Sequence, residues 1–248
     1  EASSLSVSKI SLTKQKLEQL NYILPVEAGV EVTKLIYDLS DKFFPLSTLE
    51  NRLENGLWLG RELDETGSKG WLNRECSGPL FAKGRMISRY SFIEDLTEKI
   101  NKPNWLPPAS SSFNRIIWRD VSRKNQKRRM IATILEAGPV AGNSLGVGYI
   151  RDNNKDNLQI LLGIFNSMVF EFQLRCYLAT GHVSLSALRK VRVPPITEIF
   201  HHEKLGELVA KRLKGDEAID TDIECYVAKN IYGLTKKDFV TILSAFPK

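Results

Sequence analysis

The spacing of apolar residues divides the chain into three parts. Apolar side chains recur at helical intervals across Leu5–Leu24 and again across Val30–Phe44. Between residues 46 and 150 the apolar runs become short, and turn-forming pairs such as Asn55-Gly56 and Gly138-Pro139 separate them, which is typical of short strands. The pattern therefore predicts an α+β fold. A helical lead-in (1–45) would precede a sheet-rich region (46–155) and a helical carboxy-terminal part (156–248).

The carboxy-terminal part opens with the strongest helical pattern of the chain. Its apolar positions follow the i, i+3, i+4, i+7 rule and predict one helix capped by Asp156 or Asn157. These positions are Leu158, Leu161, Leu162, Phe165, Val169 and Phe172. Further helical stretches are predicted at 184–191, 199–213, 219–232 and 235–245. Thr235 suits an N-cap because Asp238 follows three residues later.

The five clearest strand candidates lie in the middle part. They cover residues 57–59, 79–81, 115–118, 130–135 and 147–150. The strand over 115–118 would lead into a charged loop, and the next strand would begin near Met130.

Composition places the chain among ordinary globular proteins. Hydrophobic residues make up 42% of its 248 residues, so a core of useful size is available. The three cysteines, Cys76, Cys176 and Cys225, are far apart and form no CxxC pair, which argues against a zinc site or a disulfide scaffold. We expect reduced thiols and a cytoplasmic location. No apolar run reaches the roughly 20 residues that cross a bilayer, so no membrane partner is predicted.

The net charge of +6 is concentrated in one segment. Residues 115–129 hold seven basic side chains and one acidic one, a net of 7 − 1 = +6, which equals that of the whole chain. A basic loop between two strands is suited to contacting the phosphates of a nucleic acid. The other interpretation is a solvated charged hairpin, and the sequence leaves it open.

A second basic cluster lies at residues 83–90. Gly84 would let the backbone approach a partner closely, while Arg85 and Arg89 could reach phosphates or guanine edges. A plain turn with a partly buried Tyr90 would leave the same pattern. His182 follows Gly181 in a predicted loop, where a histidine contacts a ligand or makes a structural hydrogen bond.

Familiar catalytic signatures are missing from the sequence. It contains neither GxGxxG nor GxxxxGK[ST], and it lacks HExxH. It also lacks the Asn/Asp-Pro-Pro-aromatic segment of an amino-methyltransferase and the spaced acidic and Glu-x-Lys residues of a common nuclease. We therefore expect no catalytic residue, metal ligand or cofactor in this chain.

Four segments in order resemble a known family. They are Gly78–Tyr90 (GPLFAKGRMISRY), Arg115–Ser122 (RIIWRDVS), Leu161–Phe170 (LLGIFNSMVF), and Gly181–Leu188 with Val193–Ile196 (VPPI). Together they resemble the carboxy-terminal specificity region of TaqI-like adenine-specific DNA methyltransferases and the fused restriction-modification enzymes related to them. The resemblance covers roughly residues 46–245. It departs from the family pattern in one extra residue before Lys83 and in the adjacency of Pro194 and Pro195.

The resemblance implies a division of labour. This chain would read double-stranded DNA, with type IIS systems as the preferred subgroup of parent enzymes. A catalytic domain upstream in the same parent chain would bind S-adenosylmethionine, use Mg²⁺ if the parent also cleaves, and methylate adenine. In this interpretation Asn166 caps or bridges within the core rather than touching DNA. The DNA-contacting candidates are Lys83, Arg85, Arg89, Arg115, Arg119, Arg123, Lys124, Lys127, Arg128, Arg129 and His182. Arg119 could instead pair internally with Asp120 or another acid, since it follows an apolar strand.

Two other functions stay open on the sequence alone. The chain could belong to a type II restriction endonuclease and retain cleavage, which would require an acidic metal-binding cluster. It could also be a non-catalytic protein-interaction domain whose basic loop is incidental. Divalent-metal-dependent cleavage would reveal the endonuclease, and DNA binding that is absent or independent of salt would favour the protein-interaction domain.

Overall fold

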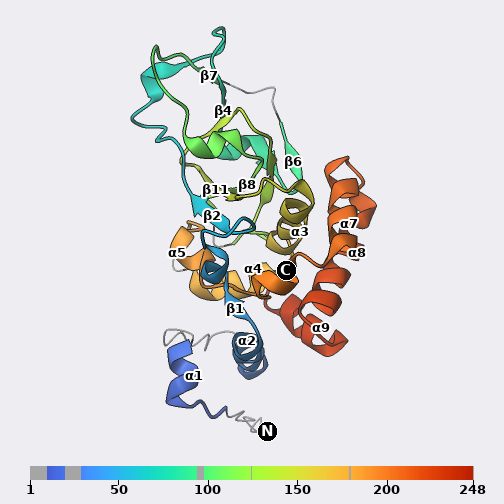
Figure 1. Ribbon diagram of the computed structural model, residues 1–248. Helices are drawn as coiled ribbons and strands as arrows, with labels where there is room; N and C mark the ends of the chain where they lie inside the picture. Colours follow the sequence, from blue (N-terminus) through green and yellow to red (C-terminus); the bar gives the residue numbers. More distant parts are fainter. Residues whose placement is uncertain (1–9, 20–28, 94–97, 124, 179, 248) are drawn as a thin grey trace.

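The computed structural model of the protein describes residues 10–19, 29–93, 98–123, 125–178 and 180–247, and it has the expected α+β fold. A central sheet occupies the middle of the molecule (Figure 1). A smaller sheet projects from one end, α2 (Val30–Lys42) lies at the other, and the carboxy-terminal helices cover one side.

The central sheet is antiparallel throughout, with strand order β2-β11-β8-β9. Its strands are β2 (Leu57–Gly60), β8 (Arg115–Arg119), β9 (Ala132–Leu135) and β11 (Leu145–Ile150). Each overlaps a strand predicted from the apolar runs. The loop between β8 and β9 is the basic segment singled out in the sequence.

Both faces of this sheet are covered. Every residue of β11 is buried, and the side chains of Ile117 and Trp118 in β8 enter different apolar clusters. Gly146 makes room for the Trp118 indole, because a Cβ atom there would lie 2.1 Å from Trp118 Cε2. The buried central strands provide a rigid base for the loops that leave their ends.

The smaller sheet has the order β10-β4-β7-β3, with a parallel β10–β4 pair and antiparallel pairs elsewhere. Its strands are β3 (Leu72–Asn73), β4 (Leu80–Ala82), β7 (Glu98–Ile100) and β10 (Val140–Ala141). Two further antiparallel pairs complete the β structure: β5 (Ile87–Ser88) with β6 (Ser91–Phe92), and β1 (Phe44–Pro45) with β12 (Arg192–Val193).

The carboxy-terminal part is helical, and its first helices pack on the central sheet. The helices are α3 (Lys155–Phe165), α4 (Met168–Tyr177), α5 (Leu185–Leu188), α6 (Ile196–Ile199), α7 (Glu203–Leu213), α8 (Asp220–Tyr226) and α9 (Lys236–Ser244). Phe165 of α3 meets Trp118 edge-on at 6.1 Å between ring centres. The apolar face predicted from the sequence is thus the face that contacts the sheet.

The predicted helix over 158–172 is two helices, α3 and α4. Ser167 caps α4 by accepting a hydrogen bond from the Phe170 amide at 3.2 Å. Asn166 turns its side chain to the sheet, where it accepts from the Ala132 amide at 3.0 Å and donates to the Ala132 carbonyl at 2.9 Å. The predicted bridging role of Asn166 is therefore confirmed, and the same bonds explain the break.

Other helix ends also differ from expectation. The cap of α3 is Asn154, which accepts from the Asn157 amide at 3.0 Å, rather than Asp156 or Asn157. The predicted stretch 199–213 divides into α6 and α7, and α8 passes into a π-helical turn over Val227–Ile231. The capping box of Thr235 and Asp238 is confirmed. Of the lead-in helix predicted at Leu5–Leu24, α1 (Lys14–Gln19) is described, and the remainder lies largely outside the described residues.

Candidate functional site

A basic hollow of about 380 Å³ opens where the two sheets meet. It is lined by Glu65, Lys83, Gly84, Arg85, Arg119, Val121 and Ser144, and we call it the basic hollow. Three lining side chains are cationic and one is anionic. The hollow thus unites the second basic cluster of the sequence with the end of β8.

Short hydrogen-bonded turns form the walls of the basic hollow. After β4 the chain makes a 3-10 turn at Gly84–Met86, and the Gly84 amide donates to the Ser144 hydroxyl at 2.9 Å. A Cβ atom at Gly84 would lie 3.0 Å from the Ser144 carbonyl oxygen. The close approach expected at Gly84 is therefore made within the protein. It locks the Arg85 turn to the loop before β11.

The three cations of the basic hollow differ in their partners. Lys83 pairs with Glu98 at 2.5 Å, and this hydrogen bond holds the pKa of the Glu98 carboxyl below its ordinary value. The Arg119 guanidinium donates to the Ile87 carbonyl oxygen. Arg85 is exposed, and its side chain makes no hydrogen bond or ion pair with any described residue. Among the described residues of this hollow, Arg85 is thus the cation free to meet an outside partner.

Asp120 holds the rim of the basic hollow together. Its carboxylate is almost fully buried and contacts both Arg61 and the Nδ1 atom of His182, the latter at 2.8 Å. The backbone continues this link, because the Val183 amide donates to the Asp120 carbonyl at 2.7 Å. The predicted candidate His182 is therefore fixed beside the basic hollow, with 57% of its side chain exposed.

Sequence reasoning missed three members of this site: Arg61, Glu65 and Ser144. Arg61 directly follows β2, and Ser144 follows the turn pair Gly142-Asn143. The sequence offered only one indication of these residues, namely that they follow a predicted strand or turn. Many residues without a function share such a position. Glu65 accepts from the Ser144 amide at 3.1 Å, which fixes the one carboxylate that lines the hollow.

Three arginines of the basic segment 115–129 pair inside the protein, although the sequence suggested them as DNA-contacting candidates. Arg115 is fully buried and binds Glu62 at 2.7 Å together with the carbonyl oxygens of Glu136 and Pro139. Burial lowers the pKa of its guanidinium, and Glu62 offsets part of that effect. Its side chain serves as an internal tie, so it is not available to a phosphate.

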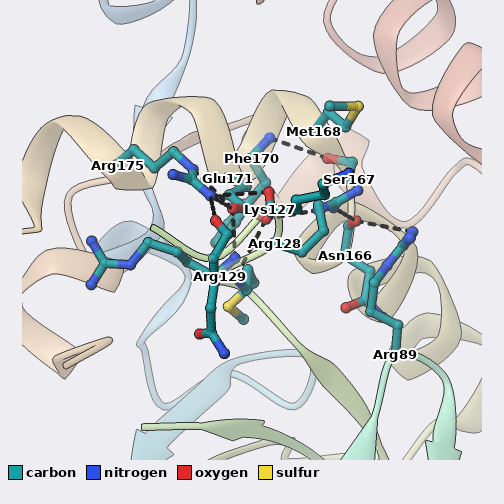
Figure 2. A network of polar contacts seen from close by, with 12 residues as sticks. Arg89, Lys127, Arg128, Arg129, Asn166, Ser167, Met168, Phe170, Glu171 and Arg175 are labelled. Atoms are coloured by element: carbon teal, nitrogen blue, oxygen red, sulfur yellow. Dashed lines mark hydrogen bonds and ion pairs between the residues drawn. The ribbon is translucent and has the colours of Figure 1, made fainter. Parts of the chain in front are cut away.

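Arg128 and Arg129 belong to a second internal network, shown in Figure 2. Arg128 binds Glu171 at 2.8 Å and Glu224 at 3.1 Å, and it also donates to the Asn166 carbonyl at the end of α3. Arg129 is buried, and its guanidinium donates to the carbonyl oxygens of Ser122 and Thr180. These arginines fasten the loop to the helices rather than facing solvent.

Glu171 is the centre of that network. Its side chain is fully buried and accepts from Arg128, from Arg175 at 2.6 Å and from the Arg129 amide at 2.6 Å. Burial disfavours the Arg128 cation, but Glu224 and Glu171 outweigh this effect and leave its guanidinium pKa raised. A buried carboxylate with several charged donors is a structural group because its bonding capacity is filled internally.

The remaining candidates lie on the surface or between these groups. Arg123 and Lys127 are exposed, and neither side chain pairs with a described residue. Arg89 is part of the helical contact, 3.6 Å from Asp220 and 3.5 Å from Glu224. Lys124 lies outside the described residues. The structure thus brings Lys83, Arg85, Arg119 and His182 together and places Arg115, Arg128 and Arg129 elsewhere.

The described ranges contain neither a cluster of metal-binding side chains nor a membrane-spanning helix. No group of three or more histidine, cysteine, aspartate or glutamate side chains could hold a metal ion there. No helix in those ranges is long and apolar enough to cross a membrane.

Comparisons with known proteins return solved structures only, since no family model and no curated protein matches. The chain is similar to the type IIG restriction endonuclease BpuSI, with 10% identity, a TM-score of 0.47, and coverage of 95% of this chain and 36% of that one. It is also similar to an HsdS subunit from Thermoanaerobacter tengcongensis (11% identity, TM-score 0.37, coverage 94% and 56%). A third similar structure is a chain of a type I R-M system (10% identity, TM-score 0.38, coverage 94% and 55%). The chain therefore spans 36–56% of the length of these proteins.

Proposed function

We propose that this chain is a sequence-reading domain for double-stranded DNA, of the kind that directs a restriction-modification enzyme to its target. The observation that carries the proposal is the basic hollow. It presents the unpaired guanidinium of Arg85 between fixed walls, beside Lys83 and Arg119. An arginine fork matches the two acceptors on the major-groove edge of guanine. The four family-like segments of the sequence support the same function, and two of them supply Arg85 and Arg119.

The exposed cations around the hollow would have a different role from Arg85. Arg61, Arg123 and Lys127 present their charges at the surface near the end of β8. Contacts from such side chains to phosphates fix the orientation of a protein on the duplex but carry no sequence information. We therefore assign base reading to Arg85 and backbone contact to Arg61, Arg123 and Lys127.

We further propose that catalysis resides in another domain of a longer parent enzyme. This part of the proposal rests on the resemblance to adenine-specific DNA methyltransferases, in which a separate upstream domain binds S-adenosylmethionine. It predicts that the present chain, given S-adenosylmethionine or Mg²⁺, neither methylates nor cleaves a duplex that it binds. Cleavage by the chain alone would instead favour the endonuclease interpretation.

The decisive experiment is selection from a randomised duplex pool at several salt concentrations, followed by sequencing of the bound fraction. We expect one short, asymmetric motif to be enriched, because one chain reads it without dimer symmetry. Binding that is steep in salt but without enrichment would contradict sequence reading. Binding that is absent at low salt would contradict DNA as the partner altogether.

A further inference from the structure

A second hollow, of about 390 Å³, lies where β1, α5 and β12 come together. It is lined by Pro45, Ser47, Tyr177, Ser186, Arg189, Lys190 and Arg192. Figure 1 places α5 and β1 next to each other on the side of the molecule opposite α7 and α8. None of these lining residues was a candidate in the sequence.

The frame of the second hollow is fixed by backbone bonds. The Leu46 amide donates to the Val191 carbonyl at 2.8 Å, and the Ser47 amide donates to the Arg189 carbonyl at 3.1 Å. On the other side, the Arg192 carbonyl accepts from the Tyr232 hydroxyl at 2.9 Å. The basic run 189–192 is thus held in one conformation, so a ligand would find its charges already placed.

The lining of the second hollow is cationic and rich in hydroxyl groups. It contains the side chains of Arg189, Lys190 and Arg192 and no carboxylate, although Glu50 nearby pairs with Arg189 at 2.6 Å. The Lys190 ammonium lies 5.9 Å from the Tyr177 ring centre and makes no ion pair with a described residue. Burial raises the pKa of the Tyr177 phenol to about 12, against an opposing effect of the neighbouring Arg192 guanidinium.

Strand β2 connects this hollow with the basic hollow. The Arg189 guanidinium donates to the Leu59 carbonyl at 3.4 Å, and Arg61, two residues further on, contacts Asp120 at the rim of the basic hollow. Two residues of an extended chain span about 7 Å. Arg189 of the second hollow and Arg61 at the rim of the basic hollow thus lie at the same end of β2.

We propose that the second hollow is a phosphate site, and that, given the DNA-reading function proposed above, it holds one backbone phosphate of the duplex read at the basic hollow. Lysine and arginine side chains with hydroxyl donors are the groups that bind phosphate oxygens. The source of the phosphate, a duplex or the free ion, is what the experiment separates.

The test compares two variants with one control. Lys190→Ala removes the unpaired ammonium, and Ser186→Glu places a carboxylate at an exposed lining position. Lys214→Ala is the matched control, because Lys214 is an exposed lysine at the C-cap of α7 that lines neither hollow. Folding is monitored by the melting temperature of each variant.

The first readout is the affinity for inorganic phosphate. It is measured by calorimetric titration of the unmodified protein and of each variant. We expect binding that weakens in Lys190→Ala and Ser186→Glu and is unchanged in Lys214→Ala. The second readout is the salt dependence of duplex binding, whose logarithmic slope should fall by about 0.9 for one lost phosphate contact. A neutral methylphosphonate can replace one phosphate of the duplex at each position in turn. At one position this replacement should weaken binding by the unmodified protein, and at that position it should not change binding by Lys190→Ala.

Each result decides the proposal. Unchanged phosphate binding and an unchanged salt slope in both variants would overturn it. Weaker phosphate binding with an unchanged slope would overturn the duplex part and leave a site for the free ion. A lowered slope without any sequence preference in the pool selection would support the phosphate site and reject sequence reading, so the two failures are distinguishable.

Discussion

The Glu171 carboxylate lies 2.8 Å from the Arg128 Nε atom and is completely shielded from solvent. Arg175 binds the same carboxylate at 2.6 Å, so one buried anion holds two guanidinium groups (Figure 2). This contact joins the loop after β8 to α4 and gives the basic segment a structural purpose that its sequence did not suggest.

Replacing Glu171 with glutamine should destabilise the protein by about 3–5 kcal/mol, because two partly buried cations lose their anion. Urea unfolding monitored by circular dichroism measures the change. A loss of unfolding free energy below about 1 kcal/mol, the range of exposed ion pairs, would contradict this prediction. It would show that glutamine and water replace the Glu171 carboxylate at little cost to stability.

Arg128 and Arg123 should behave in opposite ways although both belong to the same basic loop. Arg128→Ala should lower the free energy of unfolding, because it leaves Glu171 and Glu224 short of a partner. Arg123→Ala should leave stability unchanged and lower the salt slope of DNA binding by about 0.9. Unfolding curves and a salt series on both variants provide the comparison. A lowered slope for Arg128→Ala without loss of stability would contradict its internal role.

Arg85→Ala should relax the preference for one base pair of the target, at a cost of about 1–3 kcal/mol for the preferred base. Competition binding with every single substitution of the selected motif measures this. Arg85→Lys should keep part of the affinity but lose the bidentate match. A uniform loss of affinity across all sequences would instead assign Arg85 to a phosphate.

The Lys83–Glu98 pair should make a small, pH-dependent contribution to stability. Hydrogen bonding to Lys83 lowers the Glu98 pKa in the folded protein, so the stabilisation is present above its ordinary value of 4.5 and is lost as pH falls through the folded pKa. Both side chains are partly exposed, so the contribution stays below about 1 kcal/mol. Unfolding of the unmodified protein and of Glu98→Gln should differ at pH 7 and converge in acid. A constant difference at all pH values would exclude the linkage.

Gly146→Ala should be strongly destabilising, because its Cβ atom would lie 2.1 Å from Trp118 Cε2 in a fully buried strand. Overpacking of this kind costs about 1–3 kcal/mol or more. Thermal unfolding of this variant is best compared with Gly70→Ala, where a Cβ atom meets nothing within 4 Å. Equal melting temperatures for the two variants would contradict the close packing of Trp118.

Local signals in the sequence predicted much of the fold. Apolar runs located the four strands of the central sheet, and the Thr235 and Asp238 pair located the start of α9. Such features depend on residues close together in the chain. The break between α3 and α4 was missed because its cause, the Ala132 backbone, lies 34 residues away from Asn166.

The candidate site was predicted less completely for a related reason. Charge density identified the segment 115–129 but could not tell inward arginines from outward ones. Arg115 meets Glu62 across 53 residues of sequence, and Arg128 meets Glu224 across 96. Arg85 and Arg119 came from two separate basic clusters of the sequence, and the fold brings them to one hollow. Their neighbour Arg61 is brought in only by the fold, through Asp120.

The internal ties of the basic loop also define the smallest portable unit of this domain. A graft of residues 115–129 onto another scaffold would carry Arg115 and Arg128 without the carboxylates that pair with them. Glu62, Glu171 and Glu224 lie in the β2 connection, α4 and α8. Under the proposed DNA-reading function, an exchange of target specificity between such domains would therefore require the strands and helices to be transferred together. Arg85 and the exposed cations could be replaced individually.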